Sequence, residues 1–172
     1  VRGTNTKNSQ ASHIFYYLMS SRGCPFSCSF CFHSRKPKAP WRSHSAEWVM
    51  DQVDFINNRH PIDGIGFWDD YFFGSKKRSI QIIEFLKKRG IGFLCEVRAK
   101  ELTDDFTAWL AEMGCLQIFV GAESGTDRVL ELVNKQSTVA DYLAAAETTS
   151  KYGIPTRFSF IYGFPGETIE EM

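Results

Sequence analysis

The stretch IFYYLMSSRGCPFSCSFC (residues 14–31) joins an aromatic, strand-like run directly to a group of cysteines. Aromatic residues are enriched in strands, so residues 14–20 predict a strand. Cys24, Cys28 and Cys31 follow it with the spacing C-x3-C-x2-C, and the other two of the five cysteines stand alone further along the chain. An odd number of cysteines with this crowding does not suit a disulfide framework. The pattern predicts a metal site in a reduced, cytoplasmic chain.

Two kinds of metal site fit this loop. Three thiolates can hold three irons of a [4Fe–4S] cluster, whereas an electron-transfer cluster usually takes four cysteines. Three ligands leave one iron open to a non-protein ligand, by the logic that separates catalytic from structural zinc sites. The alternative is a Cys3His zinc site with His33 as fourth ligand. Only one residue separates Cys31 from His33, which is tighter than usual zinc spacings, so we favour the cluster.

Outward from the loop, short β-rich runs alternate with amphipathic segments. The predicted strands cover residues 14–20, 64–68, 92–98, 116–122 and 156–163, and the predicted helices cover residues 46–58, 75–89, 103–114, 126–133 and 138–151. Ser45, Thr103 and Thr138 are the predicted caps of three of these helices. Such alternation is typical of an α/β fold with parallel strands and right-handed crossovers. Cys95 and Cys115 are interpreted as small buried side chains.

Unusual polar clusters fall where the predicted strands end. They are the three cysteines, Asp69-Asp70, Arg98, Glu123-Ser124 and residues 164–167. In parallel α/β sheets and barrels the carboxyl ends of the strands carry the ligand site. We therefore expect these residues to meet at one edge. Arg98 would need a partner there, because an interior cation is unfavourable unless paired; a substrate or ligand carboxylate, Glu96 and Glu123 are all open choices.

Length and composition are typical of a single globular domain. The 172 residues suit one domain, with 43% hydrophobic residues and 15% aromatic residues, enough for a core. Lys and Arg balance Asp and Glu at 20 each, which argues against an electrostatic nucleic-acid partner. No apolar run approaches the roughly 20 residues of a membrane span. Residues 1–13 are a polar lead-in, and residues 14–172 form the expected core domain.

Four motifs together resemble the radical S-adenosylmethionine (SAM) superfamily. They are RGCPFSCSFC (22–31), WDDYFF (68–73), GAESGTDRVLELVNK (121–135) and FIYGFPGET (160–168). The last three are similar to the branch that contains cobalamin-binding radical SAM proteins, which grades into methylthiotransferase-like and coproporphyrinogen-dehydrogenase-like families. The resemblance implies a partial TIM-type (βα)6 barrel, of which this chain supplies about five βα units and ends before the sixth. Cobalamin use is implied only through a domain absent from this chain.

The resemblance also implies a cofactor at the first motif. A [4Fe–4S] cluster would be ligated by Cys24, Cys28 and Cys31, with the amino and carboxylate groups of SAM on the open iron. Phe30 would pack near the adenine, and it would also serve simply to seal the loop. Asp69 and Asp70 fall where the family's second strand ends and backbone groups meet the SAM amino group; the alternative is a solvated pair at a strand end.

Later motifs supply the remaining SAM contacts that the resemblance implies. Glu123 lies where the family offers a polar side chain to the ribose hydroxyls, and a carboxylate suits two hydroxyl donors. Lys135 lies where related enzymes place a cation for the SAM carboxylate, the alternative being an exposed lysine at a helix end. Ser159 would face the ribose, or else be a small residue of the barrel interior. Ile161 and Gly163 would meet the adenine through backbone groups.

The implied function is an enzymatic one. A reduced cluster would cleave SAM to methionine and a 5′-deoxyadenosyl radical, which would abstract hydrogen from a substrate that the sequence does not identify. Methyl transfer and oxidative rearrangement are further outcomes of this chemistry. The expected partners are a small-molecule or biosynthetic-intermediate substrate and an electron donor such as flavodoxin or ferredoxin. The alternative class is a non-catalytic iron–sulfur electron-transfer module or a zinc structural module, which would have four protein ligands and be indifferent to SAM.

Overall fold

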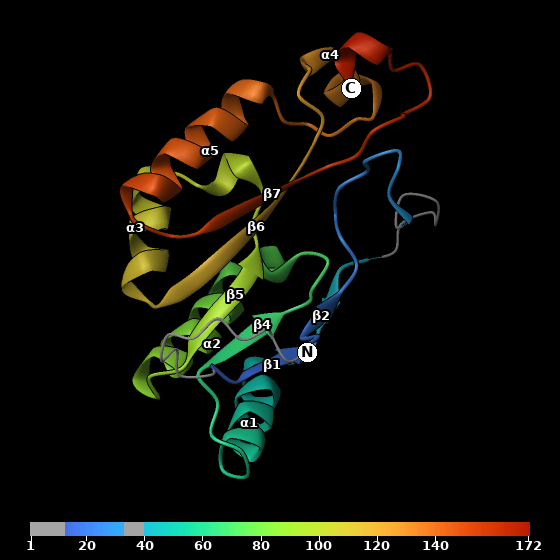
Figure 1. Ribbon diagram of the computed structural model, residues 1–172. Coiled ribbons are helices and arrows are strands. Elements are labelled where there is room, and N and C mark those ends of the chain that lie inside the picture. Colours follow the sequence, from blue (N-terminus) through green and yellow to red (C-terminus); the bar gives the residue numbers. More distant parts are fainter. Residues whose placement is uncertain (1–12, 33–39) are drawn as a thin grey trace.

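A parallel sheet of five strands forms the centre of the chain (Figure 1). The computed structural model describes residues 13–32 and 40–172, so most of the expected lead-in and the alternative zinc ligand His33 lie outside the described residues. The strands follow one another in space as β1 (Phe15–Leu18), β4 (Gly64–Phe67), β5 (Gly92–Glu96), β6 (Cys115–Glu123) and β7 (Thr156–Phe160). Every neighbouring pair in this sheet is parallel. The predicted α/β fold is confirmed, with each strand close to its predicted place.

Helices connect the strands, as the periodicity predicts. They are α1 (Ala46–Asn57), α2 (Lys76–Lys88), α3 (Asp104–Glu112), α4 (Asp127–Leu132) and α5 (Val139–Lys151). The three predicted caps are confirmed, because the side chains of Ser45, Thr103 and Thr138 each accept a hydrogen bond from a backbone N–H of the first turn. Figure 1 shows α1 and α2 together at one end of the sheet and α3 and α5 together at the other, in line with their contacts.

Short elements that the periodicity did not reveal lie close to the strand ends. β2 (Ser21–Arg22) pairs antiparallel with β3 (Arg42–Ser43). Single 3₁₀ turns cover η2 (Phe72–Gly74), η3 (Ala99–Glu101) and η4 (Ile169–Glu171). Two- and three-residue elements carry no hydrophobic period, so only tertiary contacts define them. β2 ends two residues before Cys24, so its pairing with β3 fixes the chain just ahead of the cysteine loop.

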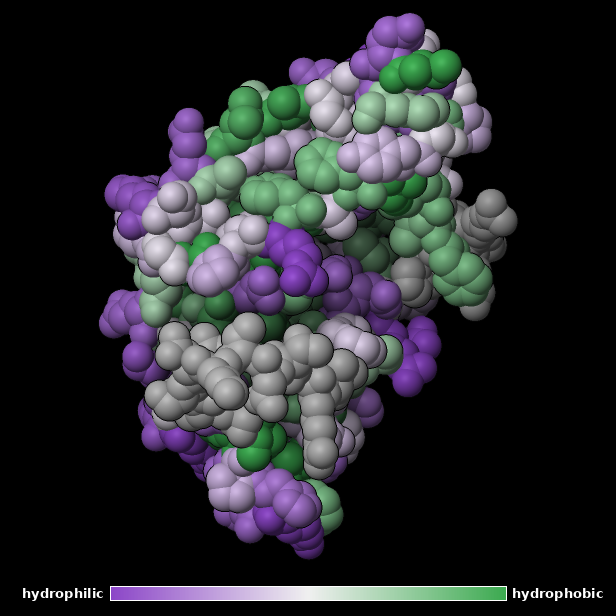
Figure 2. Space-filling view, viewed as in Figure 1, coloured by the Kyte–Doolittle hydropathy of each residue, from purple (hydrophilic) through white to green (hydrophobic). Residues whose placement is uncertain are grey.

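The core lies between the sheet and its helices. Ile65, Phe93, Ile118 and Val120 are at most 1% exposed, as are the three α2 residues Ile82, Ile83 and Leu86. Cys95 and Cys115 are also buried, at 1% and 8% exposure, as expected of small hydrophobic side chains. Figure 2 shows hydrophilic side chains in a band across the middle of the face seen in Figure 1, with apolar side chains above it, where β7 runs. Throughout the described residues, every helix is too short or too polar to cross a lipid bilayer.

Candidate active site

A cavity of about 240 Å³ lies at the carboxyl ends of β4, β5 and β6. It brings together seven of the predicted site residues, from four separate parts of the sequence: Cys24, Cys28, Cys31, Phe30, Asp70, Glu123 and Lys135. The remaining lining residues are Phe26, Tyr71, Glu96, Val97, Arg98, Ala99, Phe119, Gly121 and Ser137. The convergence follows from the topology, because parallel strands end at the same edge of the sheet. The expectation that the polar clusters meet there is confirmed for the three cysteines, Asp70, Arg98 and Glu123.

The cysteine loop is held against the segment that follows α4. The Ser29 N–H donates to the Val133 carbonyl at 2.9 Å, and Asn134 Nδ2 donates to both the carbonyl (3.1 Å) and Oγ (2.9 Å) of Ser27. Cys28 is buried, whereas Cys24 and Cys31 are partly exposed to the cavity side. Burial raises the pKa of the Cys24 thiol, the nearby thiols add to this, and a backbone hydrogen bond and Arg98 oppose it. The loop therefore presents its thiols while its backbone is fixed.

The three loop cysteines all line the same cavity. A [4Fe–4S] cluster takes each cysteine on a different iron, so three thiols on one cavity wall fit its donor set. Across the described residues, no three His, Cys, Asp or Glu side chains come close enough together to hold one metal ion.

Glu123 enters the cavity from an irregular strand end. The pairing of β6 with β7 shifts register between Gly121 and Glu123, and Glu123 has a left-handed backbone with φ of 68°. Bulges and strained residues cluster next to active sites, where they re-aim a side chain. Gly121 leaves room for it, since an added Cβ would lie 2.3 Å from Glu123 Oε1 and 3.0 Å from Lys135 Nζ.

Lys135 pairs with Glu123 inside the cavity. Its Nζ lies 2.8 Å from Glu123 Oε1, and the two side chains are only 12% and 10% exposed. Lys135 stands between Asn134 and Gln136, which both have positive φ (52° and 59°), so the chain turns sharply to aim it inward. The alternative of an exposed lysine at a helix end is therefore wrong. A buried ion pair is unfavourable to break on one side only.

Arg98 is a site residue whose partner the sequence left open. Its guanidinium stacks 3.7 Å from the centre of the Phe26 ring, and its Nη2 donates to the Lys135 carbonyl at 2.7 Å. Neither contact has a sequence signal, because one partner is a backbone oxygen and the other an aromatic ring of the cysteine loop. Arg98 thereby ties β5 to both the cysteine loop and the Lys135 turn.

Tyr71 and Glu96 complete the walls. The Tyr71 hydroxyl donates to Glu101, and its ring meets Phe26 edge-on at 5.3 Å. Burial and Glu101 raise the pKa of the Tyr71 hydroxyl, so it stays protonated. Desolvation, with Asp70 and Glu123 nearby, raises the pKa of Glu96. Tyr71 was not predicted as a site residue, because it follows the Asp pair in an aromatic run that is typical of core residues.

Phe30 seals the loop. Its ring packs against Phe164 at 5.5 Å and joins a small cluster with Val129 and Val133. It also lines the cavity, with Lys135 Nζ 5.7 Å from the ring centre. Phe30 thus closes the cysteine loop and also lines the cavity, and its packing near the adenine stays a prediction.

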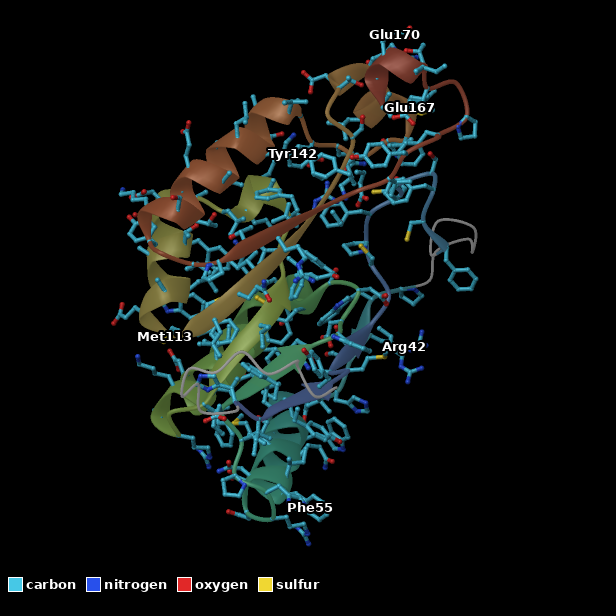
Figure 3. The ribbon with its side chains drawn as sticks, in the orientation of Figure 1. Arg42, Phe55, Met113, Tyr142, Glu167 and Glu170 are labelled. Carbon is cyan, nitrogen blue, oxygen red and sulfur yellow. The ribbon has the colours of Figure 1, made fainter. Side chains whose placement is uncertain are left out.

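The predicted residues of β7 and the following turn lie outside this cavity. Ser159 is exposed on β7, and Ile161 lines a separate hollow of about 200 Å³ with Ser124 and Glu167. Gly163 has a φ of 84°, and its N–H donates to Glu167 Oε2 at 2.5 Å. Figure 3 shows Glu167 in the turn beside α4. Their roles in binding SAM stay predictions.

The side chains of the adjacent residues Asp69 and Asp70 lie in different environments. Asp70 lines the cavity, whereas Asp69 does not and is only 2% exposed. Asp69 instead accepts hydrogen bonds from Ser20 and Ser21. The alternative of a solvated pair is therefore wrong for Asp69, because its buried side chain bonds to the segment that follows β1.

The comparisons with known proteins agree with this architecture. Residues 18–172 match the radical SAM superfamily. A protein of Pyrococcus horikoshii described as an uncharacterized methyltransferase, PH0819, is 36% identical over 160 residues, covering 92% of this chain and 35% of the relative. The anaerobic magnesium-protoporphyrin IX monomethyl ester cyclase of Rubrivivax gelatinosus is 28% identical, covering 88% of this chain and 28% of the relative.

Solved structures show the same fold. The cobalamin-dependent SAM radical enzyme OxsB, with aqua-cobalamin bound, superposes with a TM-score of 0.73 at 29% identity, over 84% of this chain and 23% of that one. The radical SAM methyltransferase TsrM of Kitasatospora setae gives a TM-score of 0.75 at 19% identity, over 90% of this chain and 30% of that one, and shows the fold alone.

This chain spans about a third or less of the length of these relatives. The family implies a [4Fe–4S] cluster and SAM, and the cavity wall with its three thiols fits that donor set. With the match over residues 18–172, the parallel sheet and the cysteine cavity, the chain belongs to the radical SAM superfamily of enzymes.

Proposed function

We propose that this chain forms the core of an enzyme that cleaves SAM reductively at a [4Fe–4S] cluster held by Cys24, Cys28 and Cys31. The observation that carries the proposal is the single cavity in which these thiols face the Glu123–Lys135 ion pair. When bound, the reduced cluster supplies the electron that breaks SAM into methionine and a 5′-deoxyadenosyl radical, which takes a hydrogen atom from the substrate.

The charges of the cavity complement those of SAM. Lys135 offers an ammonium for the SAM carboxylate, and Glu123 offers two acceptor oxygens for the ribose hydroxyls. In the ligand-free cavity the two neutralise each other at 2.8 Å. A ligand that carries both a carboxylate and hydroxyl donors can satisfy both side chains when it separates them, which a ligand with only one of these groups cannot do. Because Glu123 and Lys135 must give up each other to bind a ligand, the cavity favours ligands that carry both a carboxylate and hydroxyl groups.

The cavity walls keep water away from the reacting groups. Phe26, Phe119 and Val97 give it an apolar lining around the charged residues. Exclusion of water and correct positioning are the protein's contribution when a cofactor carries the difficult chemistry. Asp70 lines the same cavity, and we propose that backbone groups beside it meet the amino end of SAM, while Ser159, Ile161 and Gly163 meet SAM from the β7 side.

Methyl transfer is the second candidate for the reaction outcome. The observation in its favour is the 36% identity to PH0819, described as a methyltransferase, together with the similarity to cobalamin-dependent OxsB. Cobalamin would have to be supplied by a part of the protein outside this chain. We propose a small-molecule substrate and an electron donor such as a flavodoxin or ferredoxin, in keeping with a cytoplasmic enzyme.

A cysteine comparison tests the proposal. After anaerobic reconstitution with iron and sulfide and reduction with dithionite, the EPR signal is recorded with and without SAM. We expect Cys28→Ser to lose the signal, whereas the matched control Cys115→Ser, a buried cysteine outside the cavity, keeps it and its change on adding SAM. A signal that ignores SAM in the unaltered protein would support the electron-transfer module, and retained zinc without a cluster would support the zinc module.

A further inference from the structure

A buried carboxylate accepts hydrogen bonds from the segment that leads into the cysteine loop. Residues 20–23, here called the arm, lie directly before Cys24. Asp69 Oδ1 accepts the Ser20 N–H at 2.6 Å, and its Oδ2 accepts the hydroxyls of Ser20 (2.6 Å) and Ser21 (2.5 Å). Asp69, Ser20 and Ser21 are each at most 2% exposed. Charge-assisted hydrogen bonds of this kind are about twice as strong as neutral ones, and burial shields them from competing water.

Asp70 holds the other end of the arm. Its Oδ2 accepts the Gly23 N–H at 2.7 Å, one residue before Cys24. Gly23 has a φ of 88°, and a Cβ there would lie 2.9 Å from the Pro40 carbonyl oxygen. Only glycine adopts this turn without strain. Two adjacent carboxylates after β4 therefore bind the two ends of one short segment.

Arg78 of α2 also binds the arm. Its Nη2 donates to the Ser20 carbonyl at 2.9 Å, and its Nε donates to the His44 carbonyl at 2.7 Å, next to β3. Arg78 as a whole is only 7% exposed. The nearby Asp69 offsets the desolvation that lowers the pKa of Arg78. The arm is thus bonded through its N–H, its carbonyl and its hydroxyls.

We propose that Asp69, Asp70 and Arg78 are positioning residues that fix the arm, and hence Cys24, before any cofactor binds. The inference rests on the proposed function only in that the cysteines ligate the cluster. A ligand loop that is already ordered loses less conformational entropy on binding than a free one. Asp69 acts through the arm, since it does not line the cavity.

The opposite end of the sheet offers a matched control. Asp63 Oδ2 accepts the Ile14 N–H at 2.6 Å, so it makes the same type of bond to the start of β1. Its side chain is 52% exposed, and it lies away from the cysteine cavity. Asp63→Ala removes a carboxylate–backbone bond without touching the arm.

Hydrogen exchange in the cluster-free intact protein tests the proposal directly. We expect Asp69→Asn to speed exchange of the amides in residues 20–23 by about tenfold or more, the size expected when a bond to a charged acceptor is weakened. Asp63→Ala should leave these amides unchanged. Should Asp69→Asn fail to fold, Ser21→Ala removes a single hydroxyl donor and should speed the same amides to a smaller degree.

Cluster retention gives a second readout. In reconstituted protein we expect Asp69→Asn to lose iron to a ferrous chelator about tenfold faster than the unaltered protein, and Asp63→Ala to match the unaltered protein. Unchanged exchange of residues 20–23 in a folded Asp69→Asn protein overturns the proposal, as does equal iron loss from both variants. If the unaltered protein binds no iron, the proposed function fails, while the exchange result still decides whether the arm is fixed.

Discussion

Removing both partners of the Glu123–Lys135 pair should destabilise the chain less than the sum of the two single removals. Lys135→Met leaves the Glu123 carboxylate, 10% exposed, without its ammonium 2.8 Å away. Breaking a buried pair on one side is destabilising by about 3–5 kcal/mol. The double variant Glu123→Gln/Lys135→Met removes both charges, so we expect its loss to fall short of the summed single losses by about 2 kcal/mol, within the range seen for contacting residues.

Urea unfolding of the cofactor-free protein, followed by circular dichroism, gives the four free energies of this cycle. The pair between Asp104 and Lys151 is the control, since its atoms lie 2.6 Å apart but both side chains are nearly 60% exposed (59% and 58%). Exposed pairs couple by roughly 0.2–1 kcal/mol. The reasoning is refuted if the Glu123–Lys135 coupling is no larger than that of this surface pair.

Further substitutions test the cavity itself. Gly121→Ala should weaken SAM binding at least about tenfold, because its Cβ would lie 2.3 Å from Glu123 Oε1, whereas Gly125→Ala, with nothing within 4 Å, should not; titration calorimetry under anaerobic conditions checks both. Glu96 has a pKa raised above the ordinary 4.5 by partial desolvation and the nearby carboxylates, so folding stability should fall as pH rises through that raised value. Glu96→Gln should flatten this fall in thermal melts from pH 4 to 8, and an unchanged slope would contradict it. Arg98→Lys should lower the melting temperature of the cofactor-free protein, because lysine cannot both stack flat on a ring and donate to the Lys135 carbonyl.

The elements that could be predicted are those with local signals. Helix caps such as Ser45 and Thr138 and the alternation of strands with helices place the main elements close to where they lie. Because parallel strands share one carboxyl edge, the sequence also predicted that the cysteines, Asp70, Arg98 and Glu123 would meet, whereas Lys135 was implied only by the family resemblance. The β2–β3 pair was not predicted, because two-residue strands are defined by their partner and not by a sequence pattern.

The parts that could not be predicted depend on side-chain direction and on backbone partners. Asp69 and Asp70 are adjacent, yet only Asp70 lines the cavity, whereas Asp69 is buried against Ser20 and Ser21. Arg98 binds a carbonyl oxygen, which has no residue identity in the sequence. That Glu123 and Lys135 pair with each other follows from the left-handed turns at 123, 134 and 136, which no pattern marks for glutamate or glutamine.

The most direct measurement of the central claim is the yield of 5′-deoxyadenosine from SAM. The intact protein is reconstituted anaerobically with iron and sulfide, reduced with dithionite and incubated with SAM, alongside Cys28→Ser and Cys115→Ser. We predict 5′-deoxyadenosine from the unaltered protein and from Cys115→Ser, and none from Cys28→Ser. A loaded, reduced cluster that yields no 5′-deoxyadenosine, or equal yield from Cys28→Ser, would contradict the assignment of this cavity as the site of SAM cleavage.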